Sequence, residues 1–301
     1  MSSSMRSARG LAPSSSGLRL DDASPATHVR AAARLLSEHG VASAHVEAEI
    51  LLMHALGVDR AGLYARREPL DAATGRWFAR ALRRRCEGVP LQHLTGEQAF
   101  LELTLRVRPG VFIPRPETET LVEMALESIE HRSAPLVADV GTGTGAIAIA
   151  IKSHRPDARV EATDLSMDAV ALARENASRH GLDITVRRGD LLSPLPDALR
   201  RTLDLVVSNP PYVTEEEYAS LPPEVRGDPY GALVGGTRVH RRLADEVPRW
   251  LRPHGWLVME IGASQGPAAR DILAEGLEEV EVLPDPAGHD RIVRGRLPLH
   301  G

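Results

Sequence analysis

The sequence predicts an α/β protein whose larger part is a doubly wound, mainly parallel sheet, preceded by a small N-terminal helical bundle and a β-hairpin linker. From Pro116 onward, short apolar strands alternate with helical segments, the pattern of a sheet covered by helices on both faces. Polar residues follow the apolar strands at residues 136–140 and 203–208. Ligands bind beyond the carboxyl ends of strands in open α/β sheets, so these polar residues indicate a functional site.

The region before the sheet is expected to be helical and then to form a hairpin. Apolar side chains fall on one helical face in three segments, at residues 27–40, 44–56 and 72–86. Residues 100–107 alternate like a strand, and Arg108-Pro109-Gly110 is expected to turn it. We therefore predict a disordered tail at residues 1–22, a helical domain at 23–94 and a hairpin linker at 95–115.

The first strand of the sheet leads into a glycine loop. The loop consists of Gly141, Thr142, Gly143, Thr144 and Gly145, and a helix follows at residues 146–151. Glycines let a ligand approach bare backbone, and the helix N-terminus offers free N–H groups, so we assign the loop, with Asp139 in the strand, to cofactor binding. The run also fits the dinucleotide pattern Gly-x-Gly-x-x-Ala, so the loop alone leaves a nicotinamide dehydrogenase open.

Two acids end the next two strands. Asp164 closes the strand at residues 158–164, 23 residues after Gly141, a spacing suited to a carboxylate that accepts hydrogen bonds from ribose hydroxyls. Its alternative role is to cap the helix that follows. Asp190 closes the strand at 184–190 and is expected to accept from an adenine amino group, or else to be a solvated loop acid.

The strand at residues 203–208 ends in Asn209-Pro210-Pro211-Tyr212. Two prolines stiffen this loop and fix the direction of its carbonyl groups. The side-chain oxygen of Asn209 adds an acceptor, and Tyr212 adds a flat ring. We predict a slot for a planar NH2 group, with Asn209, Pro210 and Tyr212 as the catalytic residues; the alternative is an ordinary proline turn.

A cofactor site next to an amide slot indicates methyl transfer from S-adenosylmethionine to a planar nitrogen. The order of motifs resembles the Rossmann-like class I amino-methyltransferases, which act on adenine N6, guanine N2 or glutamine N5. Residues 112–119, Phe-Ile-Pro-Arg-Pro-Glu-Thr-Glu, and residues 90–100 closely resemble the signature of the release-factor glutamine N5-methyltransferases, known as PrmC or HemK. That resemblance covers about residues 25–301.

The resemblance implies methylation of the glutamine in the Gly-Gly-Gln loop of class I peptide-chain release factors. It makes residues 23–94 a substrate-recognition domain and residues 116–301 the methyltransferase domain. It also places Arg115, Glu117 and Glu119 near the substrate site beside Pro211, although ion-paired anchoring between domains explains these three equally well. The chain departs from the family at Arg238, Val239 and Leu191. Leu191, in the adenine site, stands where an aromatic residue is usual.

Charge and composition favour a protein substrate. Residues 1–115 carry 16 arginines and 11 acids, whereas residues 116–301 carry 20 basic residues and 30 acids. An acidic half that bears the active site disfavours a nucleic-acid substrate, although a local basic patch, or a ribosomal-protein substrate, stays open. The arginines at 80 and 83–85 are either a partner-binding face or a solvated helix face.

The remaining composition predicts the setting of the enzyme. One cysteine, Cys86, excludes an intrachain disulfide and a cysteine-based zinc site, and the twelve histidines form no i,i+3 or i,i+4 pair, so no metal is expected. No apolar stretch reaches the roughly 20 residues of a membrane helix. The first 20 residues also fit an organellar transit peptide, but the single lysine, Lys152, favours a GC-rich bacterium. We expect a monomer in the bacterial cytoplasm.

Overall fold

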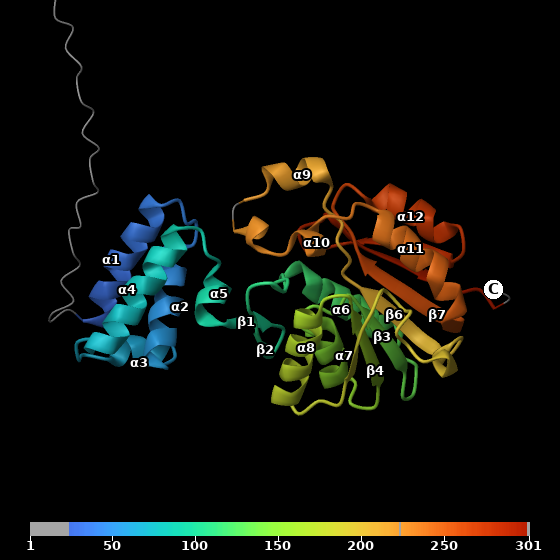
Figure 1. Cartoon of the computed structure of the whole chain (residues 1–301), viewed down its shortest axis with the longest axis horizontal. Helices are drawn as coiled ribbons and strands as arrows, with labels where there is room; N and C mark the ends of the chain where they lie inside the picture. The colour runs from blue at the N-terminus through green and yellow to red at the C-terminus, as the bar shows by residue number, and fades with distance from the viewer. Residues whose placement is uncertain (1–23, 223, 300–301) are drawn as a thin grey trace, which may run out of the picture. The chain divides into compact units, whose positions relative to one another are not determined.

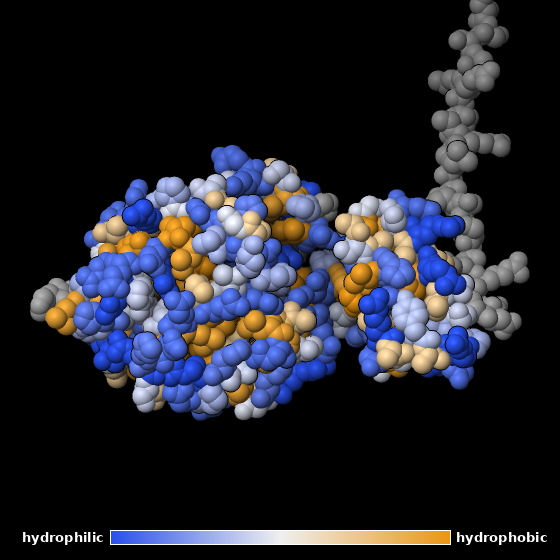
Figure 2. Space-filling view, turned by 180° about the vertical axis from the view of Figure 1, so that it is seen from behind, coloured by the Kyte–Doolittle hydropathy of each residue, from blue (hydrophilic) through white to orange (hydrophobic). Residues whose placement is uncertain are grey.

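The computed structural model describes residues 24–222 and 224–299, so the tail predicted at residues 1–22 lies outside the described residues. The chain divides between Glu87 and Gly88 into a helical unit and an α/β unit (Figure 1). None of the described helices is long and apolar enough to cross a membrane. On the face drawn in Figure 2, apolar residues form separate areas interrupted by hydrophilic ones.

The helical unit forms where the sequence predicts it. Asp71 caps its last helix by accepting from the backbone N–H groups of Ala73 and Thr74, and Gly57 ends an earlier helix in the left-handed conformation. Leu36, Leu51, Leu52, Leu63 and Phe78 make its fully buried core. The unit consists of α1 (Pro25–Glu38), α2 (Ala44–Leu56), α3 (Arg60–Ala65) and α4 (Ala72–Cys86). The sequence did not predict α3, because this helix is less than two turns long and too short to show a repeating apolar face.

The hairpin is present, but its own turn lies at residues 101–102. The turn predicted at residues 108–110 also forms, with the Val111 N–H donating to the Arg108 carbonyl at 3.3 Å, and it follows the hairpin instead of closing it. After α5 (Leu91–Thr95), β1 (Glu97–Phe100) and β2 (Leu103–Arg106) pair antiparallel with Phe100 opposite Leu103. Leu101 turns the chain with a φ of 49°, and its N–H donates to the Glu119 carboxylate at 2.9 Å. The turn therefore depends on a distant acid that stabilises a backbone conformation uncommon for leucine.

The α/β unit is the predicted doubly wound sheet. Helices α6, α7 and α8 pack on one face and α11 and α12 on the other. Seven strands lie in the order β5-β4-β3-β6-β7-β9-β8, parallel except for the last hairpin. The strands are β3 (Leu136–Val140), β4 (Arg159–Asp164), β5 (Thr185–Arg188), β6 (Leu203–Ser208), β7 (Leu251–Glu260), β8 (Glu278–Pro284) and β9 (Asp290–Arg296).

Helices and short turns complete the unit. The α-helices are α6 (Glu117–Ser128), α7 (Ala146–His154), α8 (Met167–Arg179), α9 (Glu215–Ser220), α10 (Tyr230–Leu233), α11 (Arg238–Glu246) and α12 (Gly266–Ala274). The 3-10 turns are η1 (Asp197–Leu199), η2 (Val225–Gly227) and η3 (Val247–Arg249). Strand side chains alternate between the two layers, since Val137 and Leu205 belong to one apolar cluster, and Ala138 and Val206 to the other.

Strand register brings the polar residues together. Val140 of β3 pairs with Thr163 of β4 and with Ser208 of β6, and Ser208 pairs with Met259 of β7. Each strand therefore reaches its carboxyl end at the same level of the sheet. The next residue along each strand is the first beyond this row: Asp164, Gly141, Asn209 and Glu260.

Candidate active site

The glycine loop offers open backbone at its first two glycines. Gly141 and Gly143 have φ of 73° and 56°, and a Cβ at either would meet no atom within 4 Å. Gly145 has a different role, because a Cβ there would lie 3.2 Å from Ala173 of α8. Gly141 and Gly143 therefore leave room for a ligand against bare backbone, whereas Gly145 permits close packing of α7 on α8.

Asp139 lies beneath this loop, fully buried. Its Oδ2 accepts hydrogen bonds from the Thr142 hydroxyl at 2.6 Å and from the Ala148 N–H at 3.2 Å. Its Oδ1 has no hydrogen-bond partner among the described residues. Burial raises the pKa of Asp139 to about 7, against the lowering effect of these hydrogen bonds. The carboxyl group thus holds the loop and keeps one acceptor unused.

Asp164 is tied to the same loop. Its Oδ2 accepts from the Gly143 N–H at 2.9 Å and its Oδ1 from the Ser166 N–H at 2.8 Å. Burial raises the pKa of Asp164, and the backbone hydrogen bonds oppose that rise. The cap of α8 is Ser166, whose hydroxyl accepts from the Ala169 N–H. Capping of α8 is therefore assigned to Ser166, and Asp164 keeps lone pairs for further donors.

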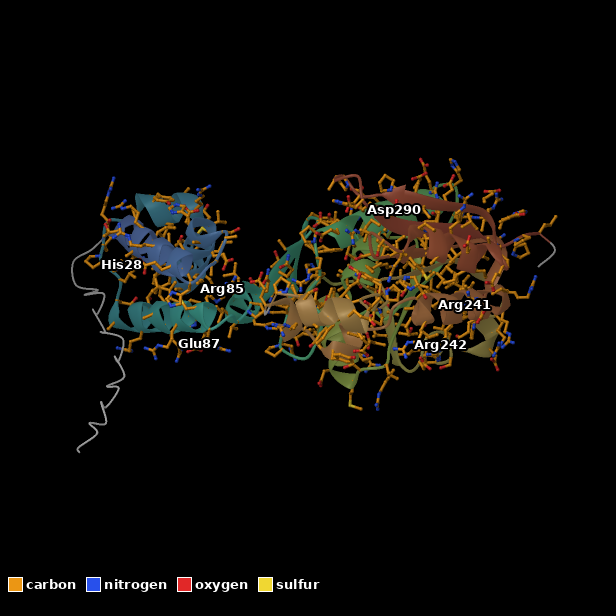
Figure 3. The ribbon with its side chains drawn as sticks, turned by 90° about the horizontal axis from the view of Figure 1, so that it is seen from above. His28, Arg85, Glu87, Arg241, Arg242 and Asp290 are labelled. Atoms are coloured by element: carbon orange, nitrogen blue, oxygen red, sulfur yellow. The ribbon has the colours of Figure 1, made fainter. Side chains whose placement is uncertain are left out.

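The strand predicted to end at Asp190 ends two residues earlier, at Arg188, and Asp190 is not a free acceptor for adenine. Asp190 is half exposed and forms an ion pair with Arg242 at 2.7 Å; Arg242 is labelled in Figure 3. Leu191 is 9% exposed with a φ of 47°, and its side chain packs in the apolar layer beside α11 and α12. Its carbonyl accepts from the Thr163 hydroxyl at 2.8 Å. The described residues contain no group of three or more His, Cys, Asp and Glu side chains placed to hold a metal ion.

The Asn-Pro-Pro-Tyr segment follows β6 directly. Asn209 Nδ2 donates to the Thr118 hydroxyl at 3.1 Å, and the Tyr212 hydroxyl donates to Glu260 at 3.1 Å. Burial, followed by the charge of Glu260, raises the pKa of Tyr212. Among the described residues, none donates a hydrogen bond to Asn209 Oδ1 or to the Pro210 carbonyl. Both acceptors predicted from the sequence are therefore available.

A second segment, residues 228–236, holds this loop in place. The Val213 N–H donates to the Leu233 carbonyl at 2.9 Å, and the Gly235 N–H returns to the Val213 carbonyl at 3.0 Å. A Cβ at Gly235 would lie 2.2 Å from the Pro211 carbonyl oxygen, so the contact tolerates only glycine. The path of the proline loop thus depends on residues 228–236, which do not adjoin the loop in the sequence.

The three residues that the sequence placed near the substrate site, Arg115, Glu117 and Glu119, form no ion pair with one another. Arg115 pairs with the buried Asp228, which also accepts from the Ile113 N–H, so Arg115 anchors the start of the 228–236 segment. Glu119 anchors the hairpin, and Glu117 is exposed in the first turn of α6. Four residues of the site had no role predicted from the sequence: Thr118, Asp228, Gly235 and Glu260. Glu260, like Asp164, is an acid at the carboxyl end of a strand, and this signal is present in the sequence.

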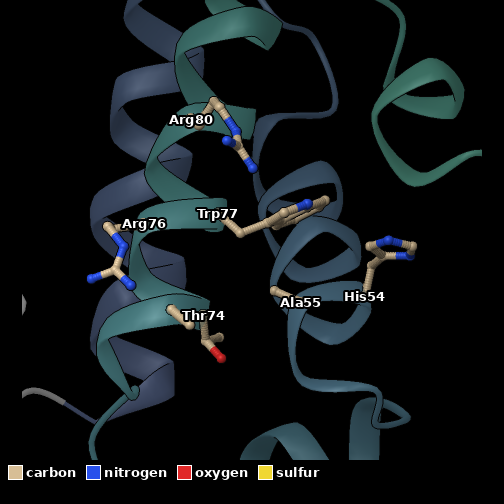
Figure 4. A pocket seen from close by; sticks show the side chains of 7 residues that line it. His54, Ala55, Thr74, Arg76, Trp77 and Arg80 are labelled. Atoms are coloured by element: carbon tan, nitrogen blue, oxygen red, sulfur yellow. The ribbon is translucent and has the colours of Figure 1, made fainter.

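The helical unit carries a groove of its own, of about 520 Å³. His54 of α2 and Trp77 of α4 lie side by side in it, with ring centroids 5.0 Å apart (Figure 4). Arg76 and Arg80 also line it. One part of the predicted arginine face is wrong, because Arg85 (labelled in Figure 3) is 6% exposed and pairs with Glu47. Packing of α4 against α2 turns Arg85 inward, whereas positions 76, 80, 83 and 84 are exposed.

The fold and the row of acids and acceptors at its carboxyl edge define a methyltransferase of the Rossmann-like class I. Residues 28–96 match the PrmC N-terminal domain and residues 102–221 the methyltransferase small domain. The catalytic domain of human METTL16 superposes with a TM-score of 0.51 at 15% identity, over 73% of this chain and 82% of that one, and shows the fold alone.

Two relatives carry the finer assignment. A release factor glutamine methyltransferase of Xylella fastidiosa is 43% identical over 259 residues, which is 84% of this chain and 93% of the relative. One of Moorella thermoacetica is 42% identical over 269 residues, or 86% and 94%. The chain belongs to the release factor glutamine methyltransferase family. The family identified from the sequence is thus confirmed.

Proposed function

We propose that this enzyme transfers the methyl group of S-adenosylmethionine to the side-chain amide nitrogen of the glutamine in the Gly-Gly-Gln loop of class I release factors, in the bacterial cytoplasm. The observation that carries the proposal is the pair of unused acceptors, Asn209 Oδ1 and the Pro210 carbonyl, beside the glycine loop. An NH2 group has two N–H bonds, and this pair offers one acceptor to each. The names of the relatives supply the substrate class.

The residues present fit the cofactor. Gly141 and Gly143 leave space against the backbone at the start of α7, where N–H groups favour a carboxylate. Asp164, held by two backbone N–H groups, accepts from the ribose hydroxyls. When Asp139 is ionised, its unpartnered Oδ1 is an acceptor for a cationic donor such as the amino group of the methionine part. Asp190 and Leu191 belong to the adenine end, with Asp190 shared with Arg242.

Chemically, the chain must activate a poor nucleophile. When bound, the cofactor supplies a methyl group on a positively charged sulfur. The lone pair of an amide nitrogen is delocalised, which makes the nitrogen a poor nucleophile. Asn209 Oδ1 and the Pro210 carbonyl accept hydrogen bonds from the two N–H groups of the substrate amide. These bonds hold the nitrogen in line with the methyl group and increase its electron density. Tyr212, fixed through its hydroxyl by Glu260, packs on the amide plane and excludes water. An ionised base is not required, since the methylated amide cation loses its proton readily.

The helical unit is the recognition domain in this proposal. Its groove combines an indole ring with Arg76 and Arg80, and Arg83 and Arg84 extend the charge along α4. Within residues 24–222 and 224–299, these four guanidinium groups have no ion pair or hydrogen bond. A carboxylate-bearing surface of the release factor satisfies them by charge complementarity.

Mass spectrometry tests the proposed function. Purified enzyme is incubated with S-adenosylmethionine and, in separate reactions, with a release factor, ribosomal proteins, tRNA, ribosomal RNA and DNA. A gain of one methyl group on the Gly-Gly-Gln glutamine, and on none of the other substrates, is the expected result. Methylation of a nucleic acid instead would refute the assignment.

A further inference from the structure

Hydrogen bonds behind Asn209 connect it through Thr118 to Glu260, which no sequence motif assigned to the site. Glu260, at the end of β7, is 1% exposed, and its carboxylate accepts from the hydroxyl groups of Thr118 at 2.8 Å and of Tyr212 at 3.1 Å. Thr118, 3% exposed in the first turn of α6, accepts from Asn209 Nδ2 at 3.1 Å. Three elements thus meet at one buried carboxylate.

Each hydrogen bond from Asn209 through Thr118 to Glu260 has a defined donor and acceptor. A hydroxyl group has one hydrogen, and Thr118 uses it on Glu260, so toward Asn209 the hydroxyl can only accept. The NH2 group of Asn209 must then face Thr118, and its oxygen must face away. The oxygen and nitrogen of an asparagine amide have nearly the same shape, so only hydrogen bonding selects between the two orientations.

We propose that Thr118 and Glu260 are positioning residues that fix the Asn209 amide with its oxygen toward the substrate. This inference rests on the proposed function, in which Asn209 Oδ1 accepts from the glutamine N–H. In the opposite orientation two NH2 groups would face each other, leaving a donor unsatisfied in a partly buried site. Glu260 therefore acts at a distance, through the hydrogen of one hydroxyl group.

The arrangement requires an ionised Glu260. Burial raises its pKa to about 7. The other groups that face it are Thr118 and Tyr212 by hydrogen bonds and Arg291 by charge, which lower its pKa, and Glu117, which raises it; His240 contacts only its backbone carbonyl. A protonated Glu260 can donate to Thr118, which frees the hydroxyl to donate to Asn209 and allows the amide to turn. The orientation is thus held while Glu260 is ionised and released as Glu260 becomes protonated.

Thr118→Val tests the first link, because it keeps the shape and removes the hydroxyl. Thr120→Val makes the same change on the same helix, at a residue whose hydroxyl has no hydrogen-bond partner among the described residues, and is the matched control. We expect Thr118→Val to lower kcat on release factor about 10- to 100-fold, with unchanged affinity for S-adenosylhomocysteine by calorimetry. Thr118→Ser restores most of the rate, whereas a residue that merely fills space would not distinguish valine from serine in this way.

The pH profile tests the second link. Wild-type kcat is expected to fall below pH 7, and Glu260→Gln is expected to be slow and to lack that transition between pH 6 and 8. Wild-type kcat in Thr118→Val at pH 8, or an acid limb retained in Glu260→Gln, overturns the inference. If Thr118→Val does not fold, the profile of Glu260→Gln decides. These outcomes require a methylated glutamine in the wild-type reaction; its absence would refute the proposed function itself.

Discussion

Replacing Asp139 by asparagine tests the cost of a charge buried under the glycine loop. The substitution keeps the shape, and the amide oxygen can still accept from Thr142 and Ala148. It removes a carboxyl group whose pKa is raised from 3.8 to about 7 by burial. The charged form is therefore the unfavourable one in the folded protein.

The magnitude follows from the two pKa values. Between pH 5 and pH 7 the unfolded chain has lost the Asp139 proton while the folded protein retains it, so raising the pH favours unfolding. The slope is about 1.4 kcal/mol per pH unit, and it ends as the pH passes the folded pKa. Relative to wild type, the free energy of unfolding of Asp139→Asn should therefore rise by about 3 kcal/mol from pH 5 to pH 8.

Urea unfolding of both proteins at pH 5, 6, 7 and 8, followed by circular dichroism, measures this difference. Asp190→Asn removes a half-exposed carboxylate from the same sheet edge and is the matched control. A difference between wild type and Asp139→Asn that stays constant with pH would refute the reasoning, because it would mean that water reaches the carboxylate. In the variant, weaker binding of S-adenosylhomocysteine at pH 8 would in addition support a role of Oδ1 in binding the cofactor.

Four further variants test the site and the groove of the helical unit. Asp164→Ala should weaken S-adenosylhomocysteine binding by about 1.5–3 kcal/mol in calorimetry while the fold stays intact; unchanged affinity would remove Asp164 from the cofactor site. Asn209→Ala should lower turnover about 10²–10³-fold in rapid-quench assays with little effect on cofactor affinity, and a wild-type rate would leave Asn209 a simple turn residue. Gly235→Ala should abolish most of the turnover, because its Cβ would lie 2.2 Å from a backbone oxygen of the proline loop; a fully active variant would show that the contact relaxes freely. Arg76→Glu combined with Arg80→Glu should raise KM for release factor at least tenfold but leave KM for a short Gly-Gly-Gln peptide unchanged, and equal effects on both substrates would argue against docking in the groove.

The sequence by itself determined the main elements of this protein and the edge of the sheet at which its candidate site lies. Apolar periodicity placed helices at residues 44–56 and 72–86 and strands at 136–140 and 203–208, where the structure has them. Glycine widens and proline restricts the backbone conformations of its own residue, so the glycine loop and the proline loop could be recognised without any tertiary contact. The rule that ligands bind at carboxyl strand ends then placed both loops at one edge of the sheet.

Only the tertiary structure decided the partners of the polar side chains. The hairpin turns at Leu101 because Glu119 accepts from its N–H, and Arg115 faces Asp228 more than a hundred residues away. Thr118 meets Glu260 because α6 packs against β7, and strand register puts Asn209 beside them. A sequence pattern reports the period and backbone freedom of neighbouring residues. The choice of a hydrogen-bond partner depends on which distant elements the packed sheet brings within 3 Å, and no local pattern encodes that.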